Sequence, residues 1–272
     1  MVMEIREGEK IMNKDIRFLI VPDVHGRDFW MTPVKETLEN TDAHIVFLGD
    51  LLDPYPQEWE EGEDYRRISI SRFQEILELK KSYPERMTLL IGNHDCGYAI
   101  GQDICRSRTD LANRKEIAGI FETHVEDFQI AYECALGGKR IIFSHAGILK
   151  GWVKEVWGEE ADDPDFNPVE KLNQAWREGD YHILYSLGIY DGFRGWGGSP
   201  FGSPVWSDIR AWVNLSQEDT YGYNICGHTQ TRENPVILET IADLDCRKVF
   251  YLDTDGHIRD YESDRVWKPS EV

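Results

Sequence analysis

Five short polar segments of this chain carry residue types that bind metal ions. They are Asp-x-His at residues 23–25, Gly-Asp-x-x-Asp at 49–53, Gly-Asn-His-Asp at 92–95, Ser-His-Ala-Gly at 144–147 and Gly-His-Thr at 227–229. Taken alone, any of these histidines is more often a buried or capping residue than a ligand. Their succession indicates one site of carboxylate, amide and imidazole ligands, which suit manganese, iron or zinc.

Each of the first four polar segments follows a short apolar run typical of a buried strand. The segments between the first three runs have helical spacing, at residues 29–39 and 65–80. Strand, helix, strand implies parallel pairs covered by helices, and the loops at the carboxyl ends of such strands converge on one edge. We therefore expect the polar loops to meet in space. The apolar runs are Ile16–Val21, His44–Leu48, Met87–Ile91 and Arg140–Phe143.

The remaining pattern predicts a mixed sheet and a looser region. Residues 128–135, followed by Gly137-Gly138 and the next strand, indicate a hairpin. Six of the nine tryptophans lie between Trp152 and Trp212, where packing is favoured and a substrate platform is the alternative. Further helices are expected at 110–121, 149–157 and 169–177, a glycine-rich stretch at 192–202, and strands at 223–226, 236–240, 248–253 and 257–261.

The ordered motifs resemble the calcineurin-like metallophosphoesterases, and within them the branch of Ser/Thr protein phosphatases and diadenosine tetraphosphate hydrolases. The resemblance runs from Asp23 to Thr229. It implies an α/β (α+β mixed) fold, a four-layer sandwich of two mixed β-sheets flanked by helices, whereas the residues themselves predict only the mixed sheet. We expect one domain over residues 15–265 with a Trp-rich insert at about 149–222, a flexible tail at 1–14 and a tail at 266–272.

The resemblance also implies how two divalent metal ions (Mn, Fe or Zn) would be held. Ions about 3.5–4 Å apart need an oxygen that serves both, and a carboxylate does this well. Gln230 stands where many relatives carry a second histidine, so it is either a weak ligand of the first ion or replaced by water. The expected ligands are Asp23 and His25 for the first ion, Asp50 as the bridge, and Asn93, His145 and His228 for the second.

Catalytic roles implied by the resemblance fall on His94 and Asp53. A water whose pKa the ions lower would attack phosphorus in line. His94 would protonate the leaving alkoxide, a role that suits imidazole because its pKa lies near neutral pH. Asp53 would orient that imidazole, and the alternative is that it only shapes the turn before Pro54.

No motif fixes an arginine that binds the substrate phosphate. The protein phosphatases of this family usually carry arginine directly after the second aspartate, where this chain has Pro54. This departure puts protein substrates in doubt. The candidates, each of which could instead be a surface residue, are Arg27, Arg194 and Arg210.

The motifs leave several functions open. A phosphomonoesterase of the protein phosphatase type, acting on a phosphoprotein or a small phosphorylated metabolite, is favoured. The nearest alternative is a pyrophosphohydrolase of dinucleoside polyphosphates or other nucleotides, because both use the same ions. A noncatalytic metal-binding module is disfavoured, since it should have lost ligands or the acid.

Charge and cysteine content restrict partners and location. The formal net charge of −20, from 50 acidic and 30 basic residues, disfavours nucleic acid polymers and anionic membranes. The acidic runs at 58–64 and 159–165 are expected to be solvated loops, with a calcium site or docking patch as alternatives. Five cysteines without a C-x-x-C pair, and no apolar run of about 18 residues, predict a cytoplasmic protein outside the membrane.

Overall fold

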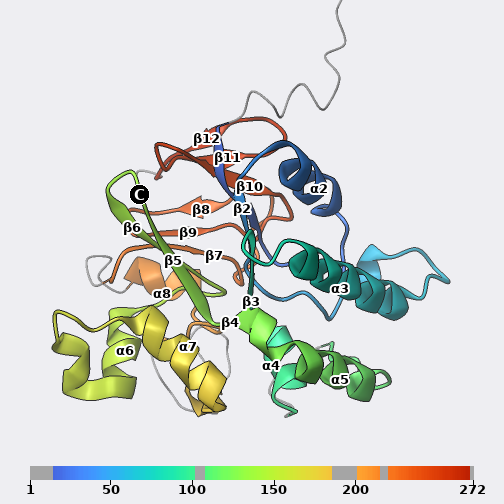
Figure 1. The fold of residues 1–272 in the computed structure, drawn as a ribbon, viewed down its shortest axis with the longest axis horizontal. Helices are drawn as coiled ribbons and strands as arrows, with labels where there is room; N and C mark the ends of the chain where they lie inside the picture. Colours follow the sequence, from blue (N-terminus) through green and yellow to red (C-terminus); the bar gives the residue numbers. More distant parts are fainter. Residues whose placement is uncertain (1–14, 102–107, 186–200, 215–219, 270–272) are drawn as a thin grey trace, which may run out of the picture.

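The computed structural model describes residues 15–101, 108–185, 201–214 and 220–269. Two β-sheets pack face to face, with helices on the outside (Figure 1). The first sheet has the order β12 (Val266–Trp267), β11 (Ile258–Asp260), β10 (Phe250–Asp253), β1 (Ile16–Val21), β2 (His44–Phe47), β3 (Met87–Leu90) and β4 (Phe128–Gln129). The second has the order β5 (Ala131–Leu136), β6 (Lys139–Ser144), β7 (Tyr223–Cys226), β9 (Ile241–Asp243) and β8 (Val236–Ile237).

Both sheets are mixed, so the predicted fold class is confirmed. In the first sheet β1 to β4 form parallel pairs, and β10 joins β1 antiparallel. In the second sheet β6, β7 and β9 run parallel, while β5 and β8 are antiparallel edges. The helices are α2 (Met31–Asn40), α3 (Tyr65–Ser82), α4 (Asn93–Ala99), α5 (Arg114–His124), α6 (Lys150–Trp157), α7 (Pro168–Glu178) and α8 (Ile209–Asn214).

Strand β1 explains why the apolar runs are continuous. Side chains alternate between the two faces of a strand. Phe18 and Ile20 pack between the sheets in one hydrophobic cluster, whereas Leu19 and Val21 pack in another cluster that includes residues of α2 and α3. Because both faces are covered from Phe18 onward, this part of the strand is continuously apolar, and the one charged residue of β1, Arg17, is exposed near its start.

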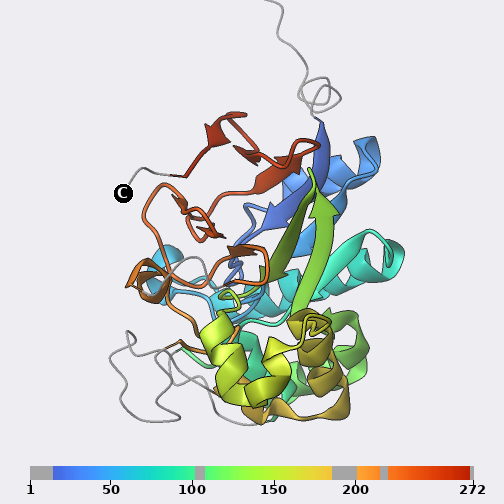
Figure 2. The ribbon, with the colours of Figure 1, turned by 90° about the vertical axis from the view of Figure 1, so that its left-hand side faces the viewer.

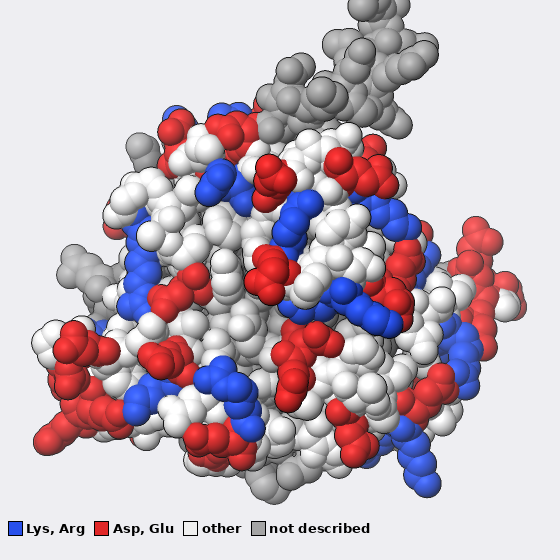
Figure 3. Space-filling view, viewed as in Figure 1, with Lys and Arg blue, Asp and Glu red and all other residues white. Residues whose placement is uncertain are grey.

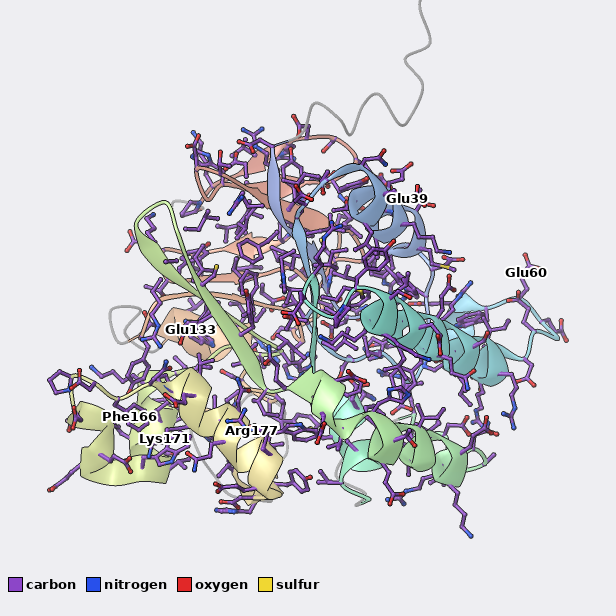
Figure 4. All side chains as sticks on the ribbon, viewed as in Figure 1. Glu39, Glu60, Glu133, Phe166, Lys171 and Arg177 are labelled. Carbon is purple, nitrogen blue, oxygen red and sulfur yellow. The ribbon has the colours of Figure 1, made fainter. Side chains whose placement is uncertain are left out.

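The insert packs against one end of the sandwich, away from β10 to β12 (Figure 2). Glu133 of β5, labelled in Figure 4, accepts hydrogen bonds from Arg140 Nε (2.6 Å) and from Asn167 Nδ2 (2.6 Å). Asn167 also caps α7 by accepting from the main-chain N–H groups of its first turn. The insert is therefore tied to the second sheet. Its buried tryptophans, Trp152, Trp176 and Trp212, are packing residues.

Several elements differ from the sequence prediction. Helix α4 was not predicted, because it is only seven residues long and starts with the polar run Asn-His-Asp. Strand β9 was missed because buried Asp243 interrupts its apolar pattern. The strand predicted over 236–240 is limited to β8, and β12 extends the first sheet beyond residue 265. Most of the glycine-rich stretch, including Arg194, lies outside the described residues.

Among the described residues, no helix combines the length and the apolar character needed to cross a bilayer.

Candidate metal centre

The polar loops converge because their strands end at the same edge of the sandwich. In the first sheet, Val21 is in register with Phe47, and Phe47 with Leu89. In the second sheet Phe143 is in register with Ile225. The loops are also linked through their backbones, since His25 N donates to Asp50 O (2.8 Å) and Gly227 N donates to His145 O (2.8 Å). Residues far apart in sequence are thereby held in fixed relative positions.

One cluster of candidate ligands surrounds His25. Its Nε2 lies 3.5 Å from Asp50 Oδ2 and 4.0 Å from Asp23 Oδ2. All three side chains are at most 3% exposed. Asp23 is oriented from the other sheet, because its Oδ1 accepts from His228 N at 3.0 Å.

A second cluster lies on the other side of Asp50. His145 Nε2 is 3.5 Å from Asp50 Oδ1 and 2.9 Å from Asn93 Oδ1. His228 Nδ1 lies 3.0 Å from the same Asn93 oxygen. The structure thus brings all six predicted ligands together, and Asp50 contacts both clusters with different oxygens, as a bridging carboxylate would.

The tautomers of two buried histidines fit metal ligation. His25 Nδ1 is 2.9 Å from Leu52 O, and His145 Nδ1 is 2.9 Å from Leu48 O. A carbonyl oxygen only accepts, so each Nδ1 carries the proton and each neutral Nε2 presents a lone pair. Those lone pairs point at carboxylate and amide oxygens, which are also acceptors. A cation is the group that satisfies such converging acceptors, and second-sphere carbonyls commonly orient metal-bound histidines in this way.

Two glycines leave room for the carboxylates. A Cβ at Gly92 would lie 2.1 Å from Asp50 Oδ1, and a Cβ at Gly227 would lie 2.1 Å from Asp23 Oδ1. No side chain can be accommodated at such distances. The glycines of two motifs are therefore required by the positions of the two aspartates.

Four site residues adopt left-handed backbone conformations that side chains rarely occupy. Their φ angles are +45° for His25, +51° for Asp50, +59° for Asp53 and +75° for His228. Each such residue costs on the order of 1–3 kcal/mol, and such residues cluster at functional sites. The rest of the fold must therefore hold these loops against their local preference.

The electrostatics of the site favour a bound cation. Burial, and then the charge of Asp245, raises the pKa of Asp23 well above its usual value. Burial and the charge of Asp23 do the same to Asp50. Burial lowers the pKa of His145 well below normal, and that of His228 to about 4. Divalent ions would offset the repulsion between the carboxylates and bind the neutral imidazoles.

His94 and Asp53 form a hydrogen-bonded pair beside the clusters. His94 Nδ1 lies 2.9 Å from Asp53 Oδ2, and His94 N donates to Asp50 Oδ1 at 2.8 Å. Tyr98 of α4 donates its hydroxyl to the other Asp53 oxygen. Burial lowers the pKa of His94, although Asp53 opposes this. His94 also has a ring nitrogen within 4.8 Å of ligand atoms on His25 and Asp50, so its position alone is compatible with ligation as well as with proton transfer.

Arg108, which was not predicted from the sequence, contacts His94 and Asp53 at the site. Its Nη2 lies 3.1 Å from His94 Nε2, and its Nε donates to Asp53 O at 3.2 Å. Its guanidinium carbon lies 3.7 Å from the centroid of the Tyr55 ring. No periodicity or motif marks this loop residue, so only the fold reveals it.

Of the other predicted binding residues, Arg27 also lies beside the site, since its Nη1 donates to Asp23 O (3.4 Å) and its guanidinium carbon lies 5.1 Å from the centroid of the Tyr55 ring. Its charge is paired with Glu58 (Nε to Oε2, 2.7 Å), which also binds Arg247. Arg210 lies at the start of α8, and its guanidinium pairs with the carboxylate of Asp208, two residues before it in the sequence. Gln230 is exposed, and no described hydrogen bond joins it to the two clusters.

Two further residues near the site were not predicted. The Trp206 ring lies edge-on to the His228 ring, with centroids 5.8 Å apart, and it is partly exposed. Asp245 is 4% exposed, and burial raises its pKa to about 6.

Comparisons with known proteins agree with this geometry. A family model described as calcineurin-like phosphoesterase matches residues 16–232. No curated protein sequence matches the chain. Among solved structures, a cold-active protein tyrosine phosphatase of a psychrophile Shewanella species is 14% identical, covering 91% of this chain and 80% of its own, with a TM-score of 0.50. A second structure titled cold-active protein tyrosine phosphatase is 13% identical, covering 92% and 79%, with a TM-score of 0.53. At these identities the likeness concerns the fold.

Proposed function

Because the chain belongs to the calcineurin-like phosphoesterases and is a metal-dependent phosphoester hydrolase, we propose that it hydrolyses phosphomonoesters at the site between the two sheets. Two divalent ions (Mn, Fe or Zn) would supply the positive charge that binds phosphate oxygens and lowers the pKa of the attacking water. The ligands we propose are Asp23, His25, Asp50, Asn93, His145 and His228.

In this proposal the side chains of Asp53 and Tyr98 fix the orientation of the His94 imidazole. Asp53 accepts from His94 Nδ1, which leaves Nε2 to exchange a proton with the leaving group. Tyr98 occupies the second Asp53 oxygen, and thereby fixes the carboxylate plane. The geometry of this pair depends on α4, which carries His94 and Tyr98, and on the loop after β2, which carries Asp53.

The observation that carries the proposal is the link between His94 and Asp50. The main-chain N–H of His94 donates to the carboxylate that contacts both ligand clusters. A proton donor is thereby held within one residue of the proposed metal ligand Asn93. A phosphate bound at the ions would have its leaving oxygen close to this imidazole.

A phosphoprotein or a small phosphorylated metabolite is the substrate we propose, and dinucleoside polyphosphates or other nucleotides are the alternative. The Trp-rich insert is the segment that could stack a nucleobase, and one of its tryptophans, Trp196, lies outside the described residues. The neighbours' titles name protein tyrosine phosphatases, so a phosphotyrosine peptide belongs in the substrate panel.

The test is turnover of four substrates by the purified protein with manganese. These are p-nitrophenyl phosphate, bis(p-nitrophenyl) phosphate, a phosphotyrosine peptide and diadenosine tetraphosphate. We expect the monoesters to be hydrolysed with the highest kcat/KM. Preference for the tetraphosphate would replace the proposal with a pyrophosphohydrolase, and loss of all activity with bound metal would favour a noncatalytic module.

A further inference from the structure

Arg108 is held beside the proposed proton donor by three contacts that do not involve a carboxylate. Its guanidinium stacks on Tyr55 with 3.7 Å between its carbon and the ring centroid, and its Nε donates to the Asp53 carbonyl (3.2 Å). Its Nη2 faces His94 Nε2 at 3.1 Å. The residue has a φ of +60°, a conformation that side chains rarely adopt. This cost is consistent with a defined position for the guanidinium.

The ion pairing of Arg108 differs from that of the two other arginines considered for phosphate binding. Arg27 and Arg210 each donate to a carboxylate, so their charges are already paired. The described hydrogen bonds of Arg108 go instead to a carbonyl oxygen and an imidazole nitrogen, neither of which carries a formal negative charge. A guanidinium also has more N–H groups than these contacts use. Among the described residues, no carboxylate pairs with Arg108, so its remaining N–H groups can bind an anion.

Arg108 lies close to the place where the transferred phosphoryl group would be bound. A leaving oxygen that accepts a proton from His94 Nε2 must lie within hydrogen-bonding distance of that nitrogen. Arg108 Nη2 occupies the same neighbourhood, so its N–H groups reach oxygens on the same phosphorus. Tyr55 contacts both Arg108 and His25, since its ring lies against the guanidinium and also packs edge-on against the His25 ring, with ring centroids 5.0 Å apart.

We propose that Arg108, supported by Tyr55, is the phosphate-binding residue that makes the site selective for phosphomonoesters over phosphodiesters. A monoester dianion carries one more negative charge than a diester and keeps an additional unesterified oxygen for a guanidinium. Hydrogen bonds between charged partners are the stronger ones, and Arg binds phosphate through a planar fork. This inference rests on the proposed function, because it names the residue that selects the substrate at the same site.

The experiment compares Arg108→Ala with wild type and with Arg114→Ala. Arg114 begins α5 and is partly exposed, and within the described part of the chain its side chain donates one long hydrogen bond, to Gly101 O (3.4 Å), which makes it a matched surface control. We expect Arg108→Ala to lower kcat/KM for p-nitrophenyl phosphate by about 10- to 100-fold, and for bis(p-nitrophenyl) phosphate by about threefold or less. Arg114→Ala should change neither value. Circular dichroism and bound manganese should match wild type for both variants.

A second measurement separates this inference from the proposed function. Binding of inorganic phosphate to the manganese-loaded protein, followed by calorimetry, should weaken about 10-fold or more in Arg108→Ala. If wild type hydrolyses neither ester but phosphate binding still depends on Arg108, the proposed function and the ester selectivity fail, and Arg108 stands as a phosphate-binding residue. Equal losses on monoester and diester, or unchanged phosphate affinity in a folded, metal-loaded variant, would overturn the assignment of Arg108.

Discussion

At the scale of single residues, the site depends on which atoms already have partners. His25 and His145 each give their Nδ1 proton to a backbone carbonyl, so only Nε2 can bind a cation. His94 differs, because its Nδ1 faces a carboxylate and its Nε2 faces a guanidinium. These different partners agree with the roles we propose, which are ligation for His25 and His145 and proton transfer for His94.

This difference predicts the effect of His94→Asn. The variant removes the proposed proton donor but none of the six proposed ligands, so we expect kcat to fall by about 10²–10⁴-fold. Bound metal, measured by elemental analysis, should stay at the wild-type level. If metal is lost in parallel with turnover, His94 is a ligand or a structural support, which its proximity to His25 and Asp50 would then explain.

At the level of residues, the sequence indicated the groups that belong to short motifs. Six of the predicted ligands each lie within a few residues of a strand end, and the structure brings these six side chains together, whereas Gln230 is exposed. Arg108 escaped prediction because its approach to His94 depends on a left-handed turn and on stacking against Tyr55. Neither feature leaves a periodic signal in the sequence.

At the scale of elements, the strands bring the loops to one edge, and the loops set the positions of the side chains at the site. Parallel register brings β1, β2 and β3 to one edge, and β6 and β7 supply the other half of the site. The close approach of loop backbone to carboxylate then decides the geometry. Gly227, directly after β7, makes such an approach, because a Cβ at this position would lie 2.1 Å from Asp23 Oδ1.

Gly227→Ala should therefore release metal with little change in the global fold. Its new Cβ would start 2.1 Å from Asp23 Oδ1, so the carboxylate or the loop must move. We expect manganese affinity to fall by about 10-fold or more, measured by calorimetric titration. Gly119→Ala on α5 is the matched control, because nothing lies within 4 Å of the Cβ it adds. Equal affinities in the two variants would contradict this role for Gly227.

Elements were predictable to different degrees for physical reasons. Strands such as β1 are buried on both faces and form apolar runs that stand out. Helix α4 has no such signal, since Asn93, His94 and Asp95 at its start are buried polar residues held by tertiary contacts. The stacking of two sheets was implied by the family resemblance alone, because periodicity within a strand does not say what covers each face.

At the scale of the whole molecule, acidic side chains are not spread evenly over the surface. On the face in Figure 3, acidic and basic side chains are interspersed, with acidic groups gathered at two opposite edges. One of these edges is the loop that carries Glu60, labelled in Figure 4. Glu58 of the same run binds Arg27 and Arg247, so part of this acidic run is tied to the protein.

Buried charge at the metal centre makes stability depend on metal and pH together. Burial raises the pKa of Asp23 and Asp50, so protonation of these carboxyl groups stabilises the metal-free fold at low pH. This stabilisation is lost as the pH rises above about 4. Burial lowers the pKa of His25 and His145, so their stabilising contribution is lost as pH falls below about 6.5. Metal binds the deprotonated form of all four groups.

We therefore expect the rise in Tm produced by manganese to be larger at pH 8 than at pH 5. The measurement is thermal unfolding of metal-free and manganese-loaded protein, both prepared by dialysis so that no chelator is present. Asp50→Asn is the comparison that should lose most of this rise. A rise that is equal at both pH values, or larger at pH 5, would contradict ligation by these buried groups.

The account depends most on Asp50 contacting two ions at once. Electron paramagnetic resonance of the metal-free protein titrated with manganese tests this directly. We predict the spectrum of an exchange-coupled pair at two equivalents per chain, and its loss in Asp50→Asn. An uncoupled single ion that persists at saturation, or no bound manganese, would contradict the dinuclear centre.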